Sequence, residues 1–320
     1  MGDKSKIEWT DASWTPIRAR NKETGKVGWH CEHVTPGCEN CYAETLNKRL
    51  GTGFPFKPGH RKDVDLFLDE AMLLKPLHWR KPRMIFVCSM TDLFADFVPD
   101  AWIDKVFAVM ALCPHHTFQI LTKRSKRMRQ YCSEQHAEHR ITSTTYLVRS
   151  GGNDNTGMIS WPLPNVWLGV SCEDQQRADE RIPDLLDTPA AVRFVSAEPL
   201  LGPIDFENIE ITSWLDGLRK TLRPEPYSEN WPKMFWDVLR GHQKWEDKIN
   251  QPKIDWIICG GESGAGHRPM QIEWAESIRQ QCAKAGTAFF FKQDSGSRSG
   301  MRGRASDDLW ACKQFPQAPQ

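Results

Sequence analysis

The chain has 320 residues, 39% of them hydrophobic, and a formal net charge of +1. That length suffices for one large α/β barrel or for two medium domains. A net charge so close to zero creates no global field that would favour nucleic acid over other partners. The sequence has no apolar run of about 18 residues. The N-terminal segment MGDKSKIEWTD is polar. We therefore expect no membrane span, no signal peptide and a cytosolic protein.

Short apolar runs recur along the chain, and each is followed by polar residues and then by a helix-like segment. Such runs are typical of strands that are buried on both faces of a parallel sheet. In chain order the predicted strands are Ser13–Ile17, Met84–Cys88, Phe118–Leu121, Val166–Val170, Val192–Val195, Trp256–Cys259 and Ala288–Phe291.

Two of the intervening segments carry clear helix signals. Apolar residues four apart form one face of a helix. The first set is Trp102, Val106 and Met110, opened by Pro99-Asp100, and the second is Trp274, Ile278 and Cys282, closed by Gly286. Alternating strands and helices predict a parallel sheet with right-handed crossovers. We expect a single domain over residues 1–320, a partial or irregular β/α barrel.

Two stretches do not fit the strand–helix pattern. Residues from about 132 to 163 are polar and rich in Gly, Ser and Asn, which predicts a surface insertion. Residues from about 206 to 252 carry four tryptophans among charged residues. Loops of this length are usually functional or have structure of their own. Trp231, Trp236 and Leu239 could share one apolar helix face, so we expect a helical insertion that acts as a lid or a partner surface.

Three of the ten cysteines cluster in one segment, WHCEHVTPGCENCYAE, as Cys31, Cys38 and Cys41. In a cytosolic chain such a cluster indicates metal or redox chemistry rather than a disulfide framework. Cys38 and Cys41 can reach one metal centre from a single turn, and Pro36-Gly37 allows the bend that brings Cys31 beside them. The other cysteines fall in apolar strand-like or helix-like runs, where cysteine behaves as a small hydrophobe.

The spacing alone leaves the metal open. Three thiolates cannot complete a four-iron cluster, so in a [4Fe–4S] centre one iron would accept an exogenous ligand. The alternative is structural zinc with His30 or His33 as the fourth ligand of a Cys3His site. We favour the cluster because zinc sites of this type are normally built on small hairpins and not beside a barrel. Unligated thiols are the remaining alternative.

Several motifs resemble those of a family of phage and bacterial proteins of unassigned function, known for a three-cysteine motif and related to radical S-adenosylmethionine enzymes. The matching segments are TPGCENCYAE, SMTDLF at 89–94, LTKR at 121–124, VWLGVS at 166–171, SAEPLLGPI at 196–204, GGESGAGHRPM at 260–270 and FFFKQ at 289–293. The resemblance covers nearly the whole chain apart from the two insertions. It implies a barrel of the radical S-adenosylmethionine type, that cofactor as the exogenous ligand, and a reductant protein as partner. The first cysteine gap holds six residues, where radical S-adenosylmethionine enzymes usually have three.

Polar residues directly after the predicted strands are the remaining site candidates, because parallel sheets place their chemistry at the carboxyl ends of strands. As cofactor-binding residues we expect Ser89, Thr91, Asp92, Glu173, Glu198, Gly260, Gly261, Glu262 and Ser263. As substrate-binding residues we expect Lys123, Arg124, His267, Arg268 and Lys292. Lys123–Arg129 holds five cations and is the best phosphate or carboxylate site in the chain. The structural alternatives are a helix cap at Asp92, a solvated helix face at 123–129 and a Gly-rich turn at 260–264.

Two functions follow from these patterns. The first is a radical S-adenosylmethionine-type enzyme, in which the cluster supplies the electron for reductive cleavage and the resulting adenosyl radical abstracts hydrogen from an unknown substrate. Nucleic acid or a nucleotide is one substrate class that the phage association suggests. The second is a nucleic-acid binder whose cysteine site is a structural zinc or cluster, supported by the basic segment KPGHRK at 57–62 and by many aromatic residues. The catalytic residues and the oligomeric state stay open.

Overall fold

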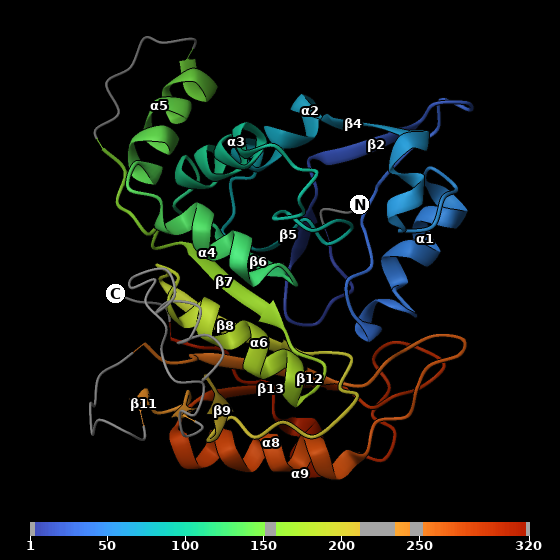
Figure 1. Ribbon diagram of the computed structural model, residues 1–320, viewed down its shortest axis with the longest axis vertical. Coiled ribbons are helices and arrows are strands. Elements are labelled where there is room, and N and C mark those ends of the chain that lie inside the picture. Colours follow the sequence, from blue (N-terminus) through green and yellow to red (C-terminus); the bar gives the residue numbers. More distant parts are fainter. Residues whose placement is uncertain (1–3, 151–157, 212–233, 244–251, 318–320) are drawn as a thin grey trace, which may run out of the picture. The chain divides into compact units, whose positions relative to one another are not determined.

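The computed structural model describes residues 4–150, 158–211, 234–243 and 252–317 (Figure 1). The chain divides into two compact units. Unit 1 comprises Met1–Gly169 with Thr188–Val192 and Ala318–Gln320, and unit 2 comprises Val170–Asp187 and Arg193–Gln317. The fold class is mixed α/β, and each unit is described below by itself.

Each of the seven predicted strands overlaps a strand of one parallel sheet, although the first ends at Trp14 and Ile17 begins a strand of a second sheet. Their order is β1-β5-β6-β7-β8-β12-β13, which is the order along the chain and is consistent with a partial β/α barrel. The bounds are β1 Ala12–Trp14, β5 Met84–Val87, β6 Thr117–Thr122, β7 Val166–Ser171, β8 Val192–Ala197, β12 Trp256–Gly260 and β13 Ala288–Gln293. Most of these residues are buried, as expected of strands that are covered on both faces.

In unit 1, β5 pairs with β1 on one side and with β6 on the other. The predicted helix after β5 is α3, Asp100–Ala111, and it buries Val106 and Met110 as the spacing indicated. Helix α4, Ser125–Ser133, follows β6. The helix after the cysteine segment is α1, Tyr42–Leu50. The shorter helices are η1 Pro36–Cys38, η2 Pro58–Asp63, α2 Glu70–Leu73 and η3 Lys75–His78.

Unit 1 also contains a second sheet that the apolar pattern did not predict. Its three antiparallel strands are β2 Ile17–Asn21, β3 Val27–Gly28 and β4 Val64–Leu68, with β2 in the middle. Strands this short give a weak periodic signal, and their pairing spans more than forty residues between β2 and β4. The cysteine segment leaves this sheet directly after β3, so the sheet fixes one end of that segment.

The predicted insertion at about 132–163 contains a helix, α5, Ala137–Ser150, which packs against α3. Ile141 and Thr145 of α5 are buried, so this part of the insertion belongs to the packed body of unit 1. The indole N–H of Trp161 donates to the carbonyl of Cys132 at 3.1 Å, which connects the two ends of the insertion. Residues 151–157 lie outside the described residues.

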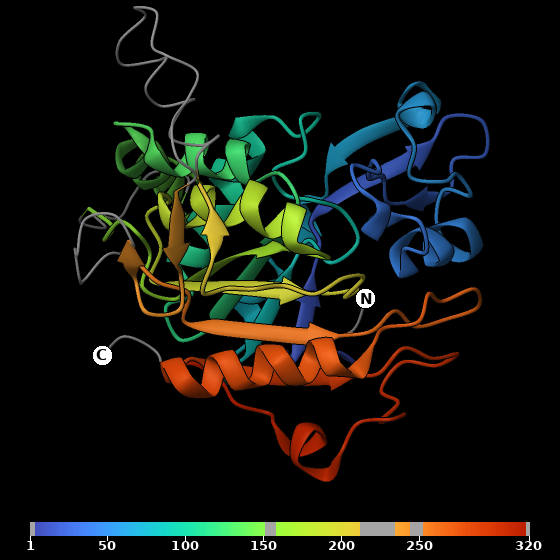
Figure 2. The ribbon, with the colours of Figure 1, turned by 60° about the horizontal axis from the view of Figure 1, so that its bottom comes forward.

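In unit 2, β12 pairs with β8 and with β13, and α8, Ile272–Ala285, runs alongside β12 and β13 (Figures 1 and 2). Gly286 ends α8 with a φ of 70°, which confirms the predicted stop at a position where a residue with a Cβ would be strained. Helix α6, Gln175–Leu186, follows β7, and the short helix α9, Asp307–Ala311, follows β13.

The described part of the Trp-rich insertion is a small antiparallel sheet of β9 Ile209–Glu210, β10 Phe235–Asp237 and β11 His242–Gln243. Trp236 lies in β10, so the expectation of a helix is wrong at this residue. The spacing of apolar residues in so short a segment fits a strand as well as a helix, and pairing between β10 and β9 decides for the strand. Residues 212–233 and 244–251, including Trp231, lie outside the described residues. Within the described ranges, every helix is too short or too polar to cross a membrane.

Candidate metal centre

The three clustered cysteines lie on one loop of unit 1 between β3 and α1. Pro36–Cys38 forms the short helix η1, closed by the amide of Cys38 donating to the carbonyl of Thr35 at 2.9 Å. This turn is the bend predicted from Pro36-Gly37. Cys41 is the N-cap residue of α1, so its thiol stands at the amino end of that helix. The loop therefore brings two of the cysteines to consecutive helix ends.

The three thiols of this loop are half-buried, and they are linked by packing contacts and electrostatic interactions. None of the ten cysteines forms a disulfide in the part of the chain that the structure describes. Cys31 and Cys41 both pack against a small apolar cluster of Ala43, Phe56 and Met90. Cys41 acts electrostatically on Cys31, and Cys38 acts on Cys41, so Cys41 lies within electrostatic reach of both other cysteines.

Burial raises the pKa of Cys31 to about 12; nearby Asp92 raises it further, while Arg124 opposes the rise. Burial also raises the pKa of Cys41, against the effect of the Glu44 and Ala43 amides in the first turn of α1. Without a metal, these two thiols are protonated at neutral pH. A metal that binds them must displace their protons.

Three side-chain hydrogen bonds tie this loop and the start of α1 to the carboxyl ends of β5 and β6. Two of them involve the segment after β5: the hydroxyl of Thr91 donates to the carbonyl of His30 at 2.6 Å, and the hydroxyl of Tyr42 donates to the carbonyl of Ser89 at 2.7 Å. A backbone bond, from the amide of His33 to the carbonyl of Phe56 at 3.1 Å, connects the loop to the segment before η2.

The third hydrogen bond is made by Arg124, which is separated from the end of β6 by one residue. Its Nη2 donates to the carbonyl of Glu32 at 3.1 Å, and its Nη1 donates to Oδ2 of Asp92 at 3.0 Å. The guanidinium thus connects the cysteine loop to both strand ends. Burial lowers the pKa of Arg124, but Asp92 and Cys31 outweigh that effect and the net pKa is raised, so the side chain stays cationic.

The sequence-predicted residues after β5 are therefore close to the cysteine loop, but their polar groups serve the protein itself. Asp92 is buried and accepts three further hydrogen bonds, from the amides of Phe94 and Lys123 at 3.0 Å each and from the hydroxyl of Thr122 at 2.7 Å. Both carboxylate oxygens are engaged, so Asp92 anchors the turn at the ends of β5 and β6 rather than offering a vacant acceptor.

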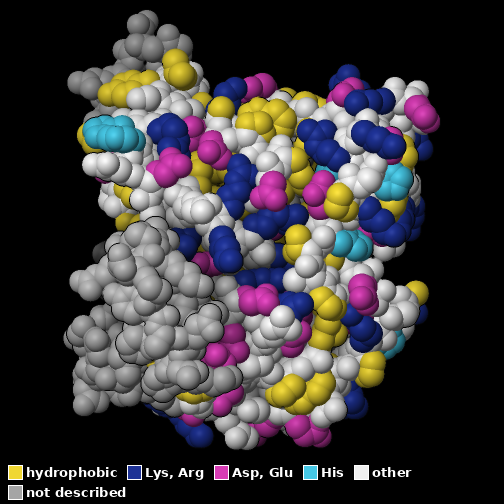
Figure 3. Space-filling view, viewed as in Figure 1, with side chains coloured by type: hydrophobic (Ala, Val, Ile, Leu, Met, Phe, Trp, Pro, Cys, Tyr) yellow, Lys and Arg dark blue, Asp and Glu magenta, His cyan; other side chains and the backbone are white. Residues whose placement is uncertain are grey.

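The five cations at 123–129 do not act as one surface. Arg124 is engaged as described, and Arg127 is held by the carbonyls of Ala95 and Val98 and by Asp100 at 2.8 Å. Lys123 acts electrostatically on Cys41, and Lys126 is exposed. Figure 3 shows Lys and Arg side chains gathered over the region of α4. Arg124 and Arg127 therefore serve the structure of the protein, whereas Lys126 faces solvent.

In unit 2 the expected cofactor-binding carboxylates are engaged in ion pairs. Glu173 is fully buried, and its Oε2 accepts from Nη1 of Arg181 at 2.9 Å. Oε1 of Glu198 lies 3.0 Å from Nζ of Lys292, and its Oε2 accepts from the hydroxyl of Ser196 at 3.1 Å. A Cβ on Gly260 would lie 2.7 Å from Oε1 of Glu198, so this glycine makes room for the ion pair.

The Gly-Gly-Glu segment is a tightly packed turn. A Cβ on Gly261 would lie 2.3 Å from the amide nitrogen of Ser295, so the second glycine permits a close approach between two loops of unit 2. Glu262 is buried and takes a fork of hydrogen bonds from Arg268, whose Nη2 donates to Oε1 at 2.6 Å and whose Nε donates to Oε2 at 3.0 Å. Ser263 forms an isolated bridge with Gly296.

Of the remaining predicted residues, His267 has its Nδ1 3.0 Å from the carbonyl of Gly264 and thus closes the same turn. Sequence reasoning also missed the buried carboxylate of Asp294, whose Oδ1 accepts from Nη2 of the exposed Arg304 at 2.8 Å. Asp294 directly follows Lys292 and Gln293 at the end of β13, so its place after an apolar strand was the available signal.

The two histidines considered as zinc ligands are each paired with a carboxylate. Nε2 of His30 lies 3.3 Å from Oε1 of Glu32, and Nε2 of His33 lies 2.7 Å from Oε2 of Glu44. A zinc ion would have to use the other ring nitrogen. Across the described ranges, no three His, Cys, Asp or Glu side chains lie close enough together to hold one metal ion.

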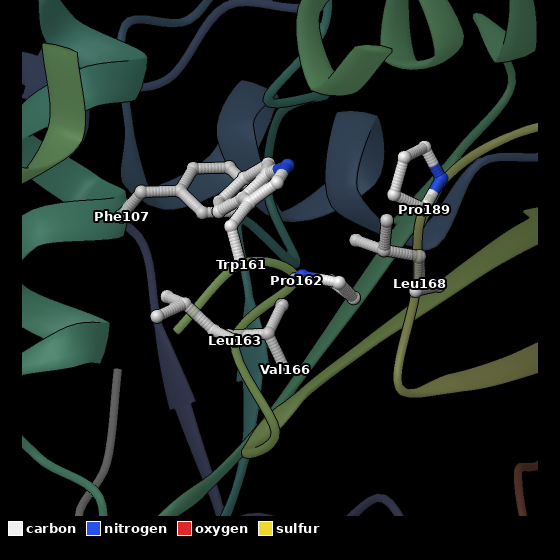
Figure 4. A pocket seen from close by; sticks show the side chains of 8 residues that line it. Phe107, Trp161, Pro162, Leu163, Val166, Leu168 and Pro189 are labelled. Atoms are coloured by element: carbon white, nitrogen blue, oxygen red, sulfur yellow. The ribbon is translucent and has the colours of Figure 1, made fainter. Parts of the chain in front are cut away.

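A small cavity of unit 1 is lined by residues of α3, β7 and the segments beside them, and by none of the cysteine loop (Figure 4). Its wall is mainly apolar and is formed by Phe107, Trp161, Pro162, Leu163, Val166, Leu168, Pro189 and Ala190. A ligand site normally adds a few polar groups that fix orientation, whereas the one polar side-chain group in this wall, the indole N–H of Trp161, already donates to the carbonyl of Cys132. We assign the cavity to core packing.

Fold and site together define a class: an α/β protein with a three-cysteine loop anchored at the carboxyl ends of parallel strands. The chain belongs to a family described as protein of unknown function (DUF5131), whose model matches residues 4–313. That description names no activity, cofactor or cysteine motif. No curated protein matches the chain, and no solved structure does.

Proposed function

We propose that this chain is an iron–sulfur protein, a radical S-adenosylmethionine-type enzyme, with Cys31, Cys38 and Cys41 as the cluster ligands. The observation that carries the proposal is the anchoring of all three thiols on one loop, which is tied to the ends of two neighbouring strands. Iron–sulfur clusters are held by cysteine thiolates, and this loop offers three half-buried cysteines.

The surroundings of the loop support bound thiolates. The guanidinium of Arg124 and the ammonium of Lys123 act on Cys31 and Cys41 respectively, and the first amides of α1 face Cys41. Positive groups at these places stabilise the negative charge that thiolates bring when they bind iron. The apolar cluster of Phe56 and Met90 screens one side of the loop from water. These polar and apolar contacts support the proposal of a [4Fe–4S] centre.

Three cysteines leave one iron of a four-iron cluster without a protein thiolate. We propose S-adenosylmethionine as its ligand, on the strength of the family resemblance of the cysteine and strand-end motifs. When bound, such a cluster supplies the electron for reductive cleavage of that cofactor. The chain's own residues hold the loop in place, limit the access of water and, through Arg124 and Lys123, favour the thiolate form that a bound metal requires. Nucleic acid or a nucleotide remains the proposed substrate class, and a reductant protein the proposed partner.

Metal analysis tests the cluster. Protein purified and reconstituted without oxygen should be brown and contain iron and sulfide. Cys38→Ala should lose both, because two thiolates hold a cluster far less tightly than three. Cys312→Ala is the matched control, since Cys312 is also half-buried but lies in unit 2, where its Sγ donates to the carbonyl of Asp308. Full iron and sulfide in Cys38→Ala would refute the assignment of ligands.

Calorimetry tests the cofactor. Cluster-loaded protein should bind S-adenosylmethionine, and cluster-free protein should bind it much more weakly, because the open iron supplies part of the affinity. S-adenosylhomocysteine serves as a second ligand that keeps the amino and carboxylate groups. No binding to the loaded protein would remove the radical-type function while leaving the iron–sulfur assignment intact.

A second candidate function is nucleic-acid binding around a structural zinc or cluster. The observation that favours it is the exposed basic segment η2, whose Arg61 lies within electrostatic reach of His30 in the cysteine loop. Cations beside a metal-stabilised loop suit a phosphate backbone. The metal analysis separates the candidates in part, because zinc gives a colourless protein without sulfide.

A further inference from the structure

We propose that Arg124 is a positioning residue that fixes the cysteine loop on the strand ends and sets the reduction potential of the cluster. This inference rests on the proposed iron–sulfur function for its second half only. The sequence pattern suggested Arg124 as an anion-binding residue for substrate. The structure instead directs both of its terminal nitrogens to groups of the protein.

The backbone of Arg124 is held in place near the end of β6. Arg124 is the N-cap residue of α4 and follows β6 after one residue, and its amide donates to the hydroxyl of Thr122 at 2.9 Å. Its side chain is only 11% exposed. An arginine held at its backbone and buried along its stem loses little further freedom when its planar fork binds two acceptors.

The first acceptor, Asp92, is an immobile anchor. Besides Arg124 it accepts from Phe94, Thr122 and Lys123, so its carboxylate is fixed from the ends of both β5 and β6. A charge-assisted hydrogen bond to such a group is among the stronger interactions available inside a protein. Arg124 is therefore held on the strand side before it reaches the loop.

The second acceptor is the carbonyl of Glu32, the residue next to the ligand Cys31. On the other side of Cys31, His30 is held by Thr91. Both chain neighbours of this cysteine are thus fastened to the strand ends, one by Arg124 and one by Thr91. Loss of the Arg124 contact would free the segment that leads from Cys31 to Cys38.

The charge of Arg124 gives it a second role. A buried cation beside Cys31 stabilises the more negative state of whatever centre that thiolate binds, and it does so more strongly than in water because the local dielectric is low. Reduction of a cluster adds one negative charge. Arg124 should therefore raise the reduction potential relative to a neutral residue at the same place.

Three variants separate position from charge. Arg124→Gln removes the charge and the fork, and Arg124→Lys keeps the charge but cannot bind Asp92 and Glu32 as a fork. Arg127→Gln is the matched control, because Arg127 is a half-buried arginine on the same helix whose contacts are Ala95, Val98 and Asp100.

Hydrogen exchange measured by mass spectrometry on cluster-free protein tests the positioning role of Arg124. Amides of the loop at 30–41 should exchange about tenfold faster in Arg124→Gln and Arg124→Lys, as expected for the loss of a charged hydrogen bond. Arg127→Gln should leave that peptide unchanged and affect the peptide around 95–100. Equal loop exchange in wild type and in both Arg124 variants would overturn the positioning role, and so would equal loop exchange in the Arg124 and Arg127 variants.

A redox titration of cluster-loaded protein, followed by electron paramagnetic resonance, tests the effect of the Arg124 charge on the reduction potential. The midpoint potential should become more negative in Arg124→Gln and stay near the wild-type value in Arg124→Lys and Arg127→Gln. If Arg124→Gln retains no cluster, a wild-type potential in Arg124→Lys supports the charge role and a shifted one refutes it. A wild type without iron and sulfide, but with the expected exchange pattern, would refute the proposed function and leave the positioning role standing.

Discussion

The buried ion pair between Glu173 and Arg181 gives the most demanding test of how unit 2 is held together. The two side chains are 0% and 5% exposed and 2.9 Å apart, and Arg181 also donates to the carbonyl of Ser171. Glu173 follows β7 and Arg181 lies on α6, so the pair fastens the helix to the end of the strand. Glu173→Ala leaves a cation buried opposite a single carbonyl.

Removing one partner of a buried pair costs about 3–5 kcal/mol, because the remaining charge stays desolvated. Urea unfolding followed by tryptophan fluorescence should show a loss of this size in Glu173→Ala. Glu180→Ala is the control, since Glu180 is half-exposed and lies 3.7 Å from Nε of Arg177, and it should change stability by less than about 1 kcal/mol. The double variant Glu173→Leu with Arg181→Met should recover most of the loss, because replacing both charges removes the unpaired one.

A loss below about 1 kcal/mol in Glu173→Ala would contradict this reasoning, since an exposed pair would cost no more. It would mean that Glu173 can reach solvent or another partner, and would reopen the sequence-based expectation that this carboxylate serves a cofactor.

Three shorter predictions concern the loops of both units. Gly261→Ala should destabilise the protein by at least about 1 kcal/mol in urea unfolding, because its Cβ would meet the amide of Ser295 at 2.3 Å; wild-type stability would show that the loops can separate without cost. Burial raises the pKa of Asp294, but the guanidinium of Arg304 and nearby amides outweigh it and the net pKa is lowered. The stability that this carboxylate contributes is therefore present above its unfolded pKa and is lost as the pH falls below about 4. Asp294→Asn should therefore reduce the loss of unfolding free energy between neutral and acid pH. An unchanged dependence of that free energy on pH would contradict the stabilising role of Asp294. If the basic segment η2 binds a phosphate backbone, Arg61→Gln should weaken binding of a single-stranded oligonucleotide and reduce its salt dependence in fluorescence anisotropy, whereas salt-independent binding would exclude that role.

The sequence by itself determined the main elements of this protein. All seven strands of the parallel sheet and the helices α3 and α8 were predicted, because buried strands and amphipathic helices leave local patterns of apolar residues. The placement of Cys31, Cys38 and Cys41 on one bent loop was local as well, since it follows from their short separation in sequence and one Pro-Gly turn.

Only the tertiary structure decided what the charged residues at the strand ends do. Arg124 is 32 residues from Asp92 and 92 residues from Glu32, so no local pattern could show that its guanidinium joins them. The same holds for the β2–β4 sheet and for Trp236, which is in a strand because β9 pairs with β10. A charge after an apolar strand looks alike in sequence whether it meets a ligand or an ion-pair partner. The partner is fixed by long-range folding, and its identity separates a binding residue from a structural one.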